Sequence, residues 1–62
     1  MKSSELLRML KQDGWIIIRQ KGSHIVMKHP LKEGTLSIPF HGHKEVGIGF
    51  LRDTLRKAKI KL

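Results

Sequence analysis

The chain has 62 residues, which is enough for one domain over residues 1–62 and leaves no room for a second. Its composition, 39% hydrophobic and 29% charged, is typical of a globular domain and excludes wholesale disorder. The absence of cysteine excludes disulfides and thiolate metal sites and fits a reducing compartment, so we expect a cytoplasmic protein. Thirteen Lys and Arg against five Asp and Glu leave a net charge of +8, which favours nucleic acid or an acidic protein surface as partner.

Neither a membrane segment nor a secretion signal is predicted. The longest unbroken apolar run, Trp15 to Ile18, is far shorter than the ~20 residues that a membrane-spanning helix needs. The charged start of the chain has no apolar segment behind it, which argues against a signal peptide. The excess of cations also argues against a Mg²⁺ or Ca²⁺ site, because such sites gather several carboxylates.

The first predicted element is a helix over residues 3–12. Three leucines recur there at the helical period. Ser3 and Ser4 are residue types that cap a helix start, and Glu5 suits the positive end of the helix dipole. Gly14 is expected to end the helix, because a left-handed cap favours a residue without Cβ.

Three strands are predicted next. Residues 15–19 are aromatic and β-branched, which predicts a strand buried mostly on both faces. Residues 24–28 form a second expected strand, and residues 35–40 alternate as a third. Close turns at residues 21–23 and 32–34 predict an antiparallel three-stranded meander.

A second helix is predicted after a polar loop. Its apolar residues fall on one face and its cations on the rest, so we expect it to be half core and half basic surface. The predicted core positions of this helix are Ile48, Leu51, Leu55 and Ala58. The fold class is therefore α+β in the order α-β-β-β-α, with both helices packed on one face of the sheet. The other face of the sheet is left free for function.

His24 is the candidate catalytic residue. Alternation along a strand places His24 and Lys28 on the solvent face and Ile25 and Met27 in the core. An imidazole has an ordinary pKa near ~6.5 and can accept or give a proton near neutrality. From the pattern alone, His24 is also explained as an ordinary polar residue at the start of a strand.

The polar loop contains residues that could bind a metal. His41, His43 and Glu45 alternate, so they would lie on one face if this segment were a strand. Gly42 and the preceding Pro39 predict a loop instead, and the net charge opposes cation capture. We therefore expect no metal and no other cofactor.

The start of the last helix offers a second candidate surface. Gly47 and Gly49 flank a helix start, where free amides can hold a phosphate, although glycines that allow a tight turn explain them equally well. Arg52 and Arg56 belong to a basic face of this helix, which could simply be solvated. Because the cations are gathered on one side, we expect this face to contact phosphates.

In the order and identity of these residues, the sequence resembles the HicA family of toxins. Members of that family are small ribosome-independent mRNA interferases paired with HicB antitoxins. The resemblance covers nearly the whole chain and is strongest over residues 19–24, with further support from residues 28–30 and 38–56. It implies a fold like a double-stranded-RNA-binding domain. Phe50 departs from the family, which often has Thr after the glycine at the helix start, so a phosphate contact from that position is not expected here.

The resemblance also implies the roles of the site residues. The family's catalytic histidine follows a Gly-Ser turn, which corresponds to His24, with RNA as substrate and a HicB-type antitoxin as partner in a hetero-oligomer. General-base catalysis by His24 on a ribose 2′-hydroxyl would need no metal. The expected substrate-binding residues are Lys21, Gly22, Ser23, Lys28, His41, Lys44, Arg52 and Arg56. The alternative function is a non-catalytic RNA-binding module that uses the same face.

Overall fold

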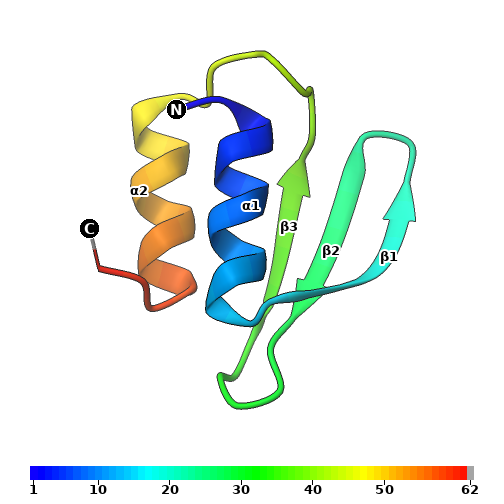
Figure 1. The fold of residues 1–62 in the computed structure, drawn as a ribbon, viewed down its shortest axis with the longest axis vertical. Helices are drawn as coiled ribbons and strands as arrows, with labels where there is room; N and C mark the ends of the chain where they lie inside the picture. Colours follow the sequence, from blue (N-terminus) through cyan, green and yellow to red (C-terminus); the bar gives the residue numbers. More distant parts are fainter. Residues whose placement is uncertain (62) are drawn as a thin grey trace.

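The computed structural model describes residues 1–61 and confirms the predicted order of helix, three strands and helix (Figure 1). The three strands form one antiparallel sheet in the order β1-β2-β3, as in a double-stranded-RNA-binding domain. Within residues 1–61, no helix is long and apolar enough to cross a bilayer. The elements are α1 (Ser3–Asp13), β1 (Ile16–Lys21), β2 (His24–Lys28), β3 (Thr35–Pro39) and α2 (Ile48–Lys57).

One face of the sheet carries the core. Ile25 and Met27 of β2 are buried, as are Leu36 and Ile38 of β3, and the residues between them along each strand are exposed or half-buried. These side chains pack in one cluster with buried leucines of both helices. Both helices therefore cover the same face, as predicted, and each buried aliphatic side chain contributes about 1.5–3 kcal/mol.

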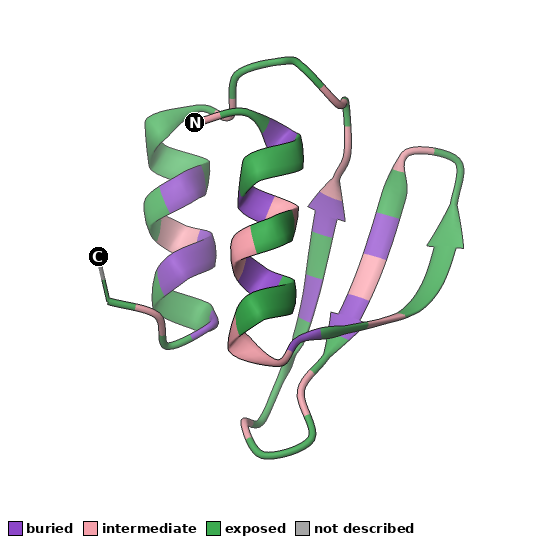
Figure 2. Ribbon diagram, viewed as in Figure 1, coloured by how far each residue is buried: buried purple, intermediate pink, exposed green. Residues whose placement is uncertain are grey.

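The first strand is present as predicted, but its expected burial was wrong. β1 begins at Ile16 rather than Trp15, and it is the most exposed strand of the sheet (Figure 2). Ile16 pairs with Lys28 and Ile17 with Met27, but the register shifts before Arg19, so Ile18 is the extra residue of a β-bulge. Ile17, opposite the buried Met27, faces the core, whereas Ile16, opposite the exposed Lys28, faces away from it, and both Ile16 and Ile18 are more than half exposed.

Both helix starts also differ from the prediction. Ser3 and Ser4 do not cap α1: the N-cap is Lys2, whose backbone N–H donates to the Glu5 carboxylate at 3.0 Å. The loop before α2 completes this end, because its carbonyl oxygens accept the Ser3 and Ser4 amides. In α2, Ile48 is 66% exposed and lies outside the core, where Thr54 is buried instead.

His29 joins the end of α1 to the loop after β2. Its ring lies edge-on to the buried Trp15, with ring centroids 5.3 Å apart. The Nδ1 atom accepts the backbone amides of Leu31 and Lys32 at 3.0 and 3.1 Å. The proton therefore sits on Nε2, which donates to the Asp13 carbonyl oxygen at 2.7 Å. Both nitrogens are occupied, so this histidine has a structural role.

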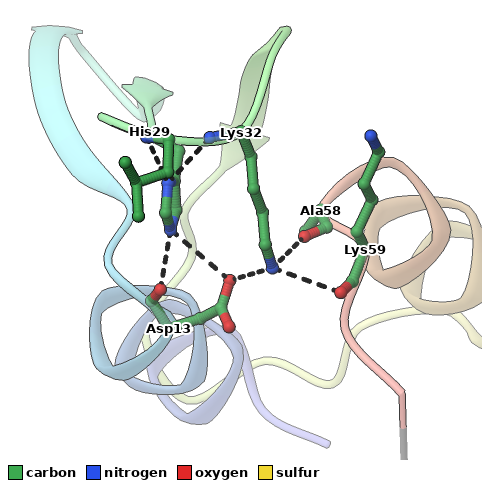
Figure 3. Close-up of polar contacts among 6 residues, drawn as sticks. Asp13, His29, Lys32, Ala58 and Lys59 are labelled. Carbon is green, nitrogen blue, oxygen red and sulfur yellow. Dashed lines mark hydrogen bonds and ion pairs between the residues drawn. The ribbon is translucent and has the colours of Figure 1, made fainter.

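Lys32 extends this junction to the second helix (Figure 3). Its ammonium donates to the Asp13 carboxylate at 2.5 Å and to the carbonyl oxygens of Ala58 and Lys59 at 2.9 and 3.2 Å. The hydrogen bond from Lys32 lowers the pKa of Asp13, and the nearby charge of Lys32 adds to the effect. One side chain thus holds the ends of both helices against the β2–β3 loop.

We predict that Asp13→Asn lowers the free energy of unfolding at pH 7. Because the folded pKa of Asp13 is lowered, its contribution is present above the ordinary aspartate pKa and is lost as pH falls through the folded value. The difference in stability between wild type and variant should therefore shrink in acid. Denaturant titrations at pH 7 and pH 3 measure this difference.

Asp53→Asn provides the matched control. Asp53 pairs with Arg56 and Lys57 inside one helix, and both of these partners are largely exposed, so its loss should cost less than that of Asp13. Equal losses for the two variants would contradict a special role for the Asp13–Lys32 pair.

Candidate functional site

The free face of the sheet presents His24. Ile25 and Met27 of β2 point into the core, and the alternation of a strand therefore directs His24 to the opposite face. His24 is exposed, as the sequence predicted. It is also the first residue of β2, so it lies directly after the turn that joins β1 to β2.

The β1–β2 turn is tight and anchored. Gly22 and Ser23 form a two-residue connection between the paired residues Lys21 and His24. Gly22 has a φ of +59°, and glycine with positive φ at the first central position is the signature of a type II′ hairpin turn. The Ser23 carbonyl accepts the amide of Phe40 at 2.6 Å, which ties the turn to the end of β3. The turn thus fixes the backbone next to His24.

The strand register determines which side chains surround His24. Lys21 lies directly across from it on β1 and Pro39 directly across on β3. Arg19 and Ser37 belong to the neighbouring row of the same face, diagonal to His24. This arrangement makes a shallow hollow of about 570 Å³. Its lining comprises Arg19, Lys21, Gly22, Ser23, His24, Val26 and Ser37.

The hollow is strongly cationic. No acidic residue occurs between Asp13 and Glu33, a stretch that includes the whole β1–β2 hairpin. Three of the five acidic residues form ion pairs away from this face: Asp13, Glu45 and Asp53. Within residues 1–61, neither Arg19 nor Lys21 forms an ion pair, so both remain available to an anion. A phosphate is one anion that such a hollow, with glycine backbone at its rim, can accommodate.

The hollow combines an anion-binding surface with a group that can move a proton. An imidazole beside fixed cations can act as a general base on a hydroxyl while the cations hold the adjacent phosphate. No three His, Asp or Glu side chains within residues 1–61 gather as a metal site would require. The chemistry that the described side chains offer is therefore proton transfer with electrostatic stabilisation of an anion.

The structure does not bring the other predicted residues to the hollow. Lys28 shares the outer face with His24 but lies four residues along β2, which is about 13 Å away at strand spacing. His41 and Lys44 line a second hollow of about 180 Å³, and Pro39 belongs to its wall. The second hollow also includes Ser3 of α1 and Phe50 of α2, so it lies at the end of β3 next to the starts of both helices.

The two arginines of α2 lie on the helical layer. Arg52 and Arg56 are exposed, and Arg56 is paired with Asp53 at 2.8 Å. Since α2 packs on the core side, neither arginine shares the free face of the sheet with His24. His43 is exposed in the loop and lines neither hollow.

Sequence reasoning missed Arg19 and Ser37 as site residues. A signal for Arg19 was present, because a two-residue turn between Lys21 and His24 sets Arg19 opposite Val26 on the outer face. For Ser37 no such signal existed, since the register of β3 depends on a longer loop and on the burial of Leu36 and Ile38. Tertiary packing places Ser37 there.

Comparison with known proteins identifies the family. The model of the family described as HicA toxin of bacterial toxin-antitoxin matches residues 3–60. A solved structure described as the HicA3 and HicB3 toxin-antitoxin complex is similar, with a TM-score of 0.82 and 32% sequence identity over 100% of this chain and 98% of that chain. No curated protein matches the sequence significantly. Because the match spans nearly the whole chain and the fold agrees, the protein belongs to the HicA family of toxins from bacterial toxin–antitoxin systems.

Proposed function

We propose that this toxin is a metal-independent endoribonuclease that cleaves mRNA, with His24 as general base. The observation that supports this most directly is the exposed imidazole of His24 beside the unpaired cations Arg19 and Lys21, on a turn whose backbone is open to a ligand. Membership of the HicA family supports the same activity.

The reaction uses a nucleophile that RNA itself carries. The neutral His24 imidazole takes the proton of a ribose 2′-hydroxyl, and the resulting oxygen attacks the adjacent phosphorus. The bond from phosphorus to the 5′-oxygen breaks, and that oxygen takes up a proton from water. The products are a 2′,3′-cyclic phosphate and a 5′-hydroxyl. No atom changes its oxidation state, so no oxidant is needed, and the imidazole replaces a metal as the group that activates the hydroxyl.

The side chains around His24 have separate roles in this proposal. Lys21, directly across the hairpin, and Arg19, on the next row, stabilise the charge that develops on the phosphate oxygens. Gly22 and Ser23 let the RNA backbone approach the turn, because Gly22 carries no side chain to block it.

Contacts farther from His24 bind the flanking RNA. Lys28 continues the outer face along β2, whereas His41 and Lys44 offer contacts past Pro39, in the second hollow at the starts of the helices. Arg52 and Arg56 would meet the RNA only where the strand passes onto the helical layer, so their contribution to affinity is the smallest of the set.

A HicB-type antitoxin is the proposed protein partner. The similar structure is a complex of a toxin with its antitoxin, which supports a hetero-oligomer for this chain as well. A net charge of +8 favours an acidic partner, and the unpaired cations of the hollow are the natural place for its carboxylates. An antitoxin that covers this surface would exclude RNA from His24.

We predict that His24→Ala abolishes RNA cleavage and toxicity while RNA affinity stays near that of wild type. Loss of a positioned general base should lower the cleavage rate by about 10²–10⁴-fold. Cleavage of labelled mRNA by the purified proteins measures the rate, and His43→Ala, a histidine outside both hollows, is the matched control. Undiminished cleavage by His24→Ala would refute the catalytic assignment and leave a non-catalytic RNA-binding module.

A substrate change tests the nucleophile independently of the protein. We expect one 2′-deoxyribose on the 5′ side of the scissile phosphate to stop cleavage at that phosphate, because the attacking oxygen is gone. Binding should be nearly unchanged, since the phosphates remain. Cleavage of this oligonucleotide at the original position would show that water or another group attacks instead.

The free face of the sheet, rather than the helical layer, should carry the RNA. Arg19→Ala should reduce the slope of log affinity against log salt by about 0.7, the value for one phosphate contact on a single strand. Arg8, exposed on α1, provides the control, and Arg8→Ala should leave the slope unchanged. A reduced slope for Arg8→Ala together with an unchanged slope for Arg19→Ala would place the RNA on the helices. Binding titrations with catalytically inactive protein, from low to high salt, give both slopes.

A further inference from the structure

The two edges of the sheet differ in what lies beside them. At one edge, α2 runs close to β3, and the two elements together line a hollow that includes Thr35 and Lys57. At the other edge, β1 pairs only with β2, and Figure 1 shows no element of the described chain on its outer side. The outward backbone amides and carbonyls of β1 are therefore open to pairing with another strand.

The open edge has an apolar part. Ile16 is 55% exposed and Ile18 is 54% exposed, although the three consecutive isoleucines would suit a buried strand. Ile16 lies opposite the exposed Lys28, and Ile18 is the unpaired residue of the bulge, so neither side chain packs in the core. Exposed aliphatic side chains on an open strand edge indicate a surface that another protein covers, because RNA backbones gain little from aliphatic contacts.

The same edge has a cationic part. Arg19 and Lys21 follow Ile18 toward the turn, and Lys28 stands opposite Ile16 on the neighbouring strand. With no acidic residue between Asp13 and Glu33, a second copy of this edge would bring like charges together. Repulsion between like charges therefore disfavours pairing of this edge with a second copy of the chain. An acidic partner would instead be attracted to it.

We infer that the outer edge of β1 accepts an extended, acidic segment of the antitoxin, which adds a fourth strand to the sheet. Backbone hydrogen bonds to β1 would supply affinity. Apolar residues of that segment would contact Ile16 and Ile18, and carboxylates would pair with Arg19 and Lys21. The inference rests on the proposed function for the identity of the partner, but the added strand is a separate claim about how the partner binds.

Such a strand would also inhibit the toxin. Arg19 and Lys21 belong both to the edge strand and to the lining of the hollow beside His24. Carboxylates paired with these two cations would occupy the positions that phosphate oxygens need. The antitoxin could then prevent cleavage without touching the imidazole itself.

Hydrogen exchange tests the added strand directly. The toxin is co-expressed with a HicB-type antitoxin, and amide exchange is compared between free toxin and purified complex. We expect the outward amides of β1, which lack a partner in the free toxin, to become strongly protected in the complex. A stable complex without new protection in residues 16–21 would overturn the inference. Failure to form any complex would instead count against the proposed antitoxin partnership, and with it the inference.

Paired variants test the chemistry of the edge. Ile18→Glu removes an apolar contact and places a negative charge against an acidic strand, so affinity for the antitoxin should fall by about tenfold or more. Leu31→Glu makes the same change at a residue that is 89% exposed in the β2–β3 loop, and its affinity should match wild type. RNA cleavage by both free variants should persist, which shows that they fold. Equal affinity of the two variants would refute the edge contact.

Discussion

The site depends on the alternation of side chains along β2. This central strand is only five residues long, and two of them, Ile25 and Met27, are buried under the helices. A shift of one residue in register would exchange the two faces and bury a histidine and a lysine in place of aliphatic side chains. The hydrophobic contribution of two buried residues therefore holds His24 in solvent, and every function proposed for its imidazole depends on that placement.

A small domain has little core with which to fix its loops, and this one uses a polar junction as well. Lys32 links the Asp13 carboxylate to the carbonyl oxygens that end α2, while His29 holds the end of α1 to the loop after β2. Gly14 is required there: with φ at +109°, a Cβ would lie 2.7 Å from the His29 ring nitrogen. The junction is at the end of β2 opposite His24, so one end of the strand is devoted to stability and the other to function.

The proposed catalysis and the proposed inhibition draw on the same residues. The β1–β2 hairpin carries unpaired cations because no acidic residue lies within it, and a hollow of this kind attracts phosphates and carboxylates alike. What distinguishes the two ligands is the open edge of β1, where exposed isoleucines and free backbone groups suit a polypeptide strand and offer nothing to RNA. An acidic strand on that edge could compete for the cations of the site while drawing its affinity from contacts that RNA does not make.

The sequence alone determined the element order, β2 within its true bounds, the burial of Trp15 and the outward direction of His24, because these follow from local periodicity and turn chemistry. It failed where a longer-range interaction decided the outcome. Ile16 and Ile18, which their β-branched composition had placed in the core, are exposed on an edge strand, and loop carbonyls rather than serine side chains completed the start of α1. The neighbours that His24 gains from another strand also depend on tertiary structure: Ser37 lies beside it because the pairing of β2 with β3 sets which residues share a row. Local sequence specifies which way a side chain points, whereas the partners it meets depend on how distant strands are aligned by the packing of the core.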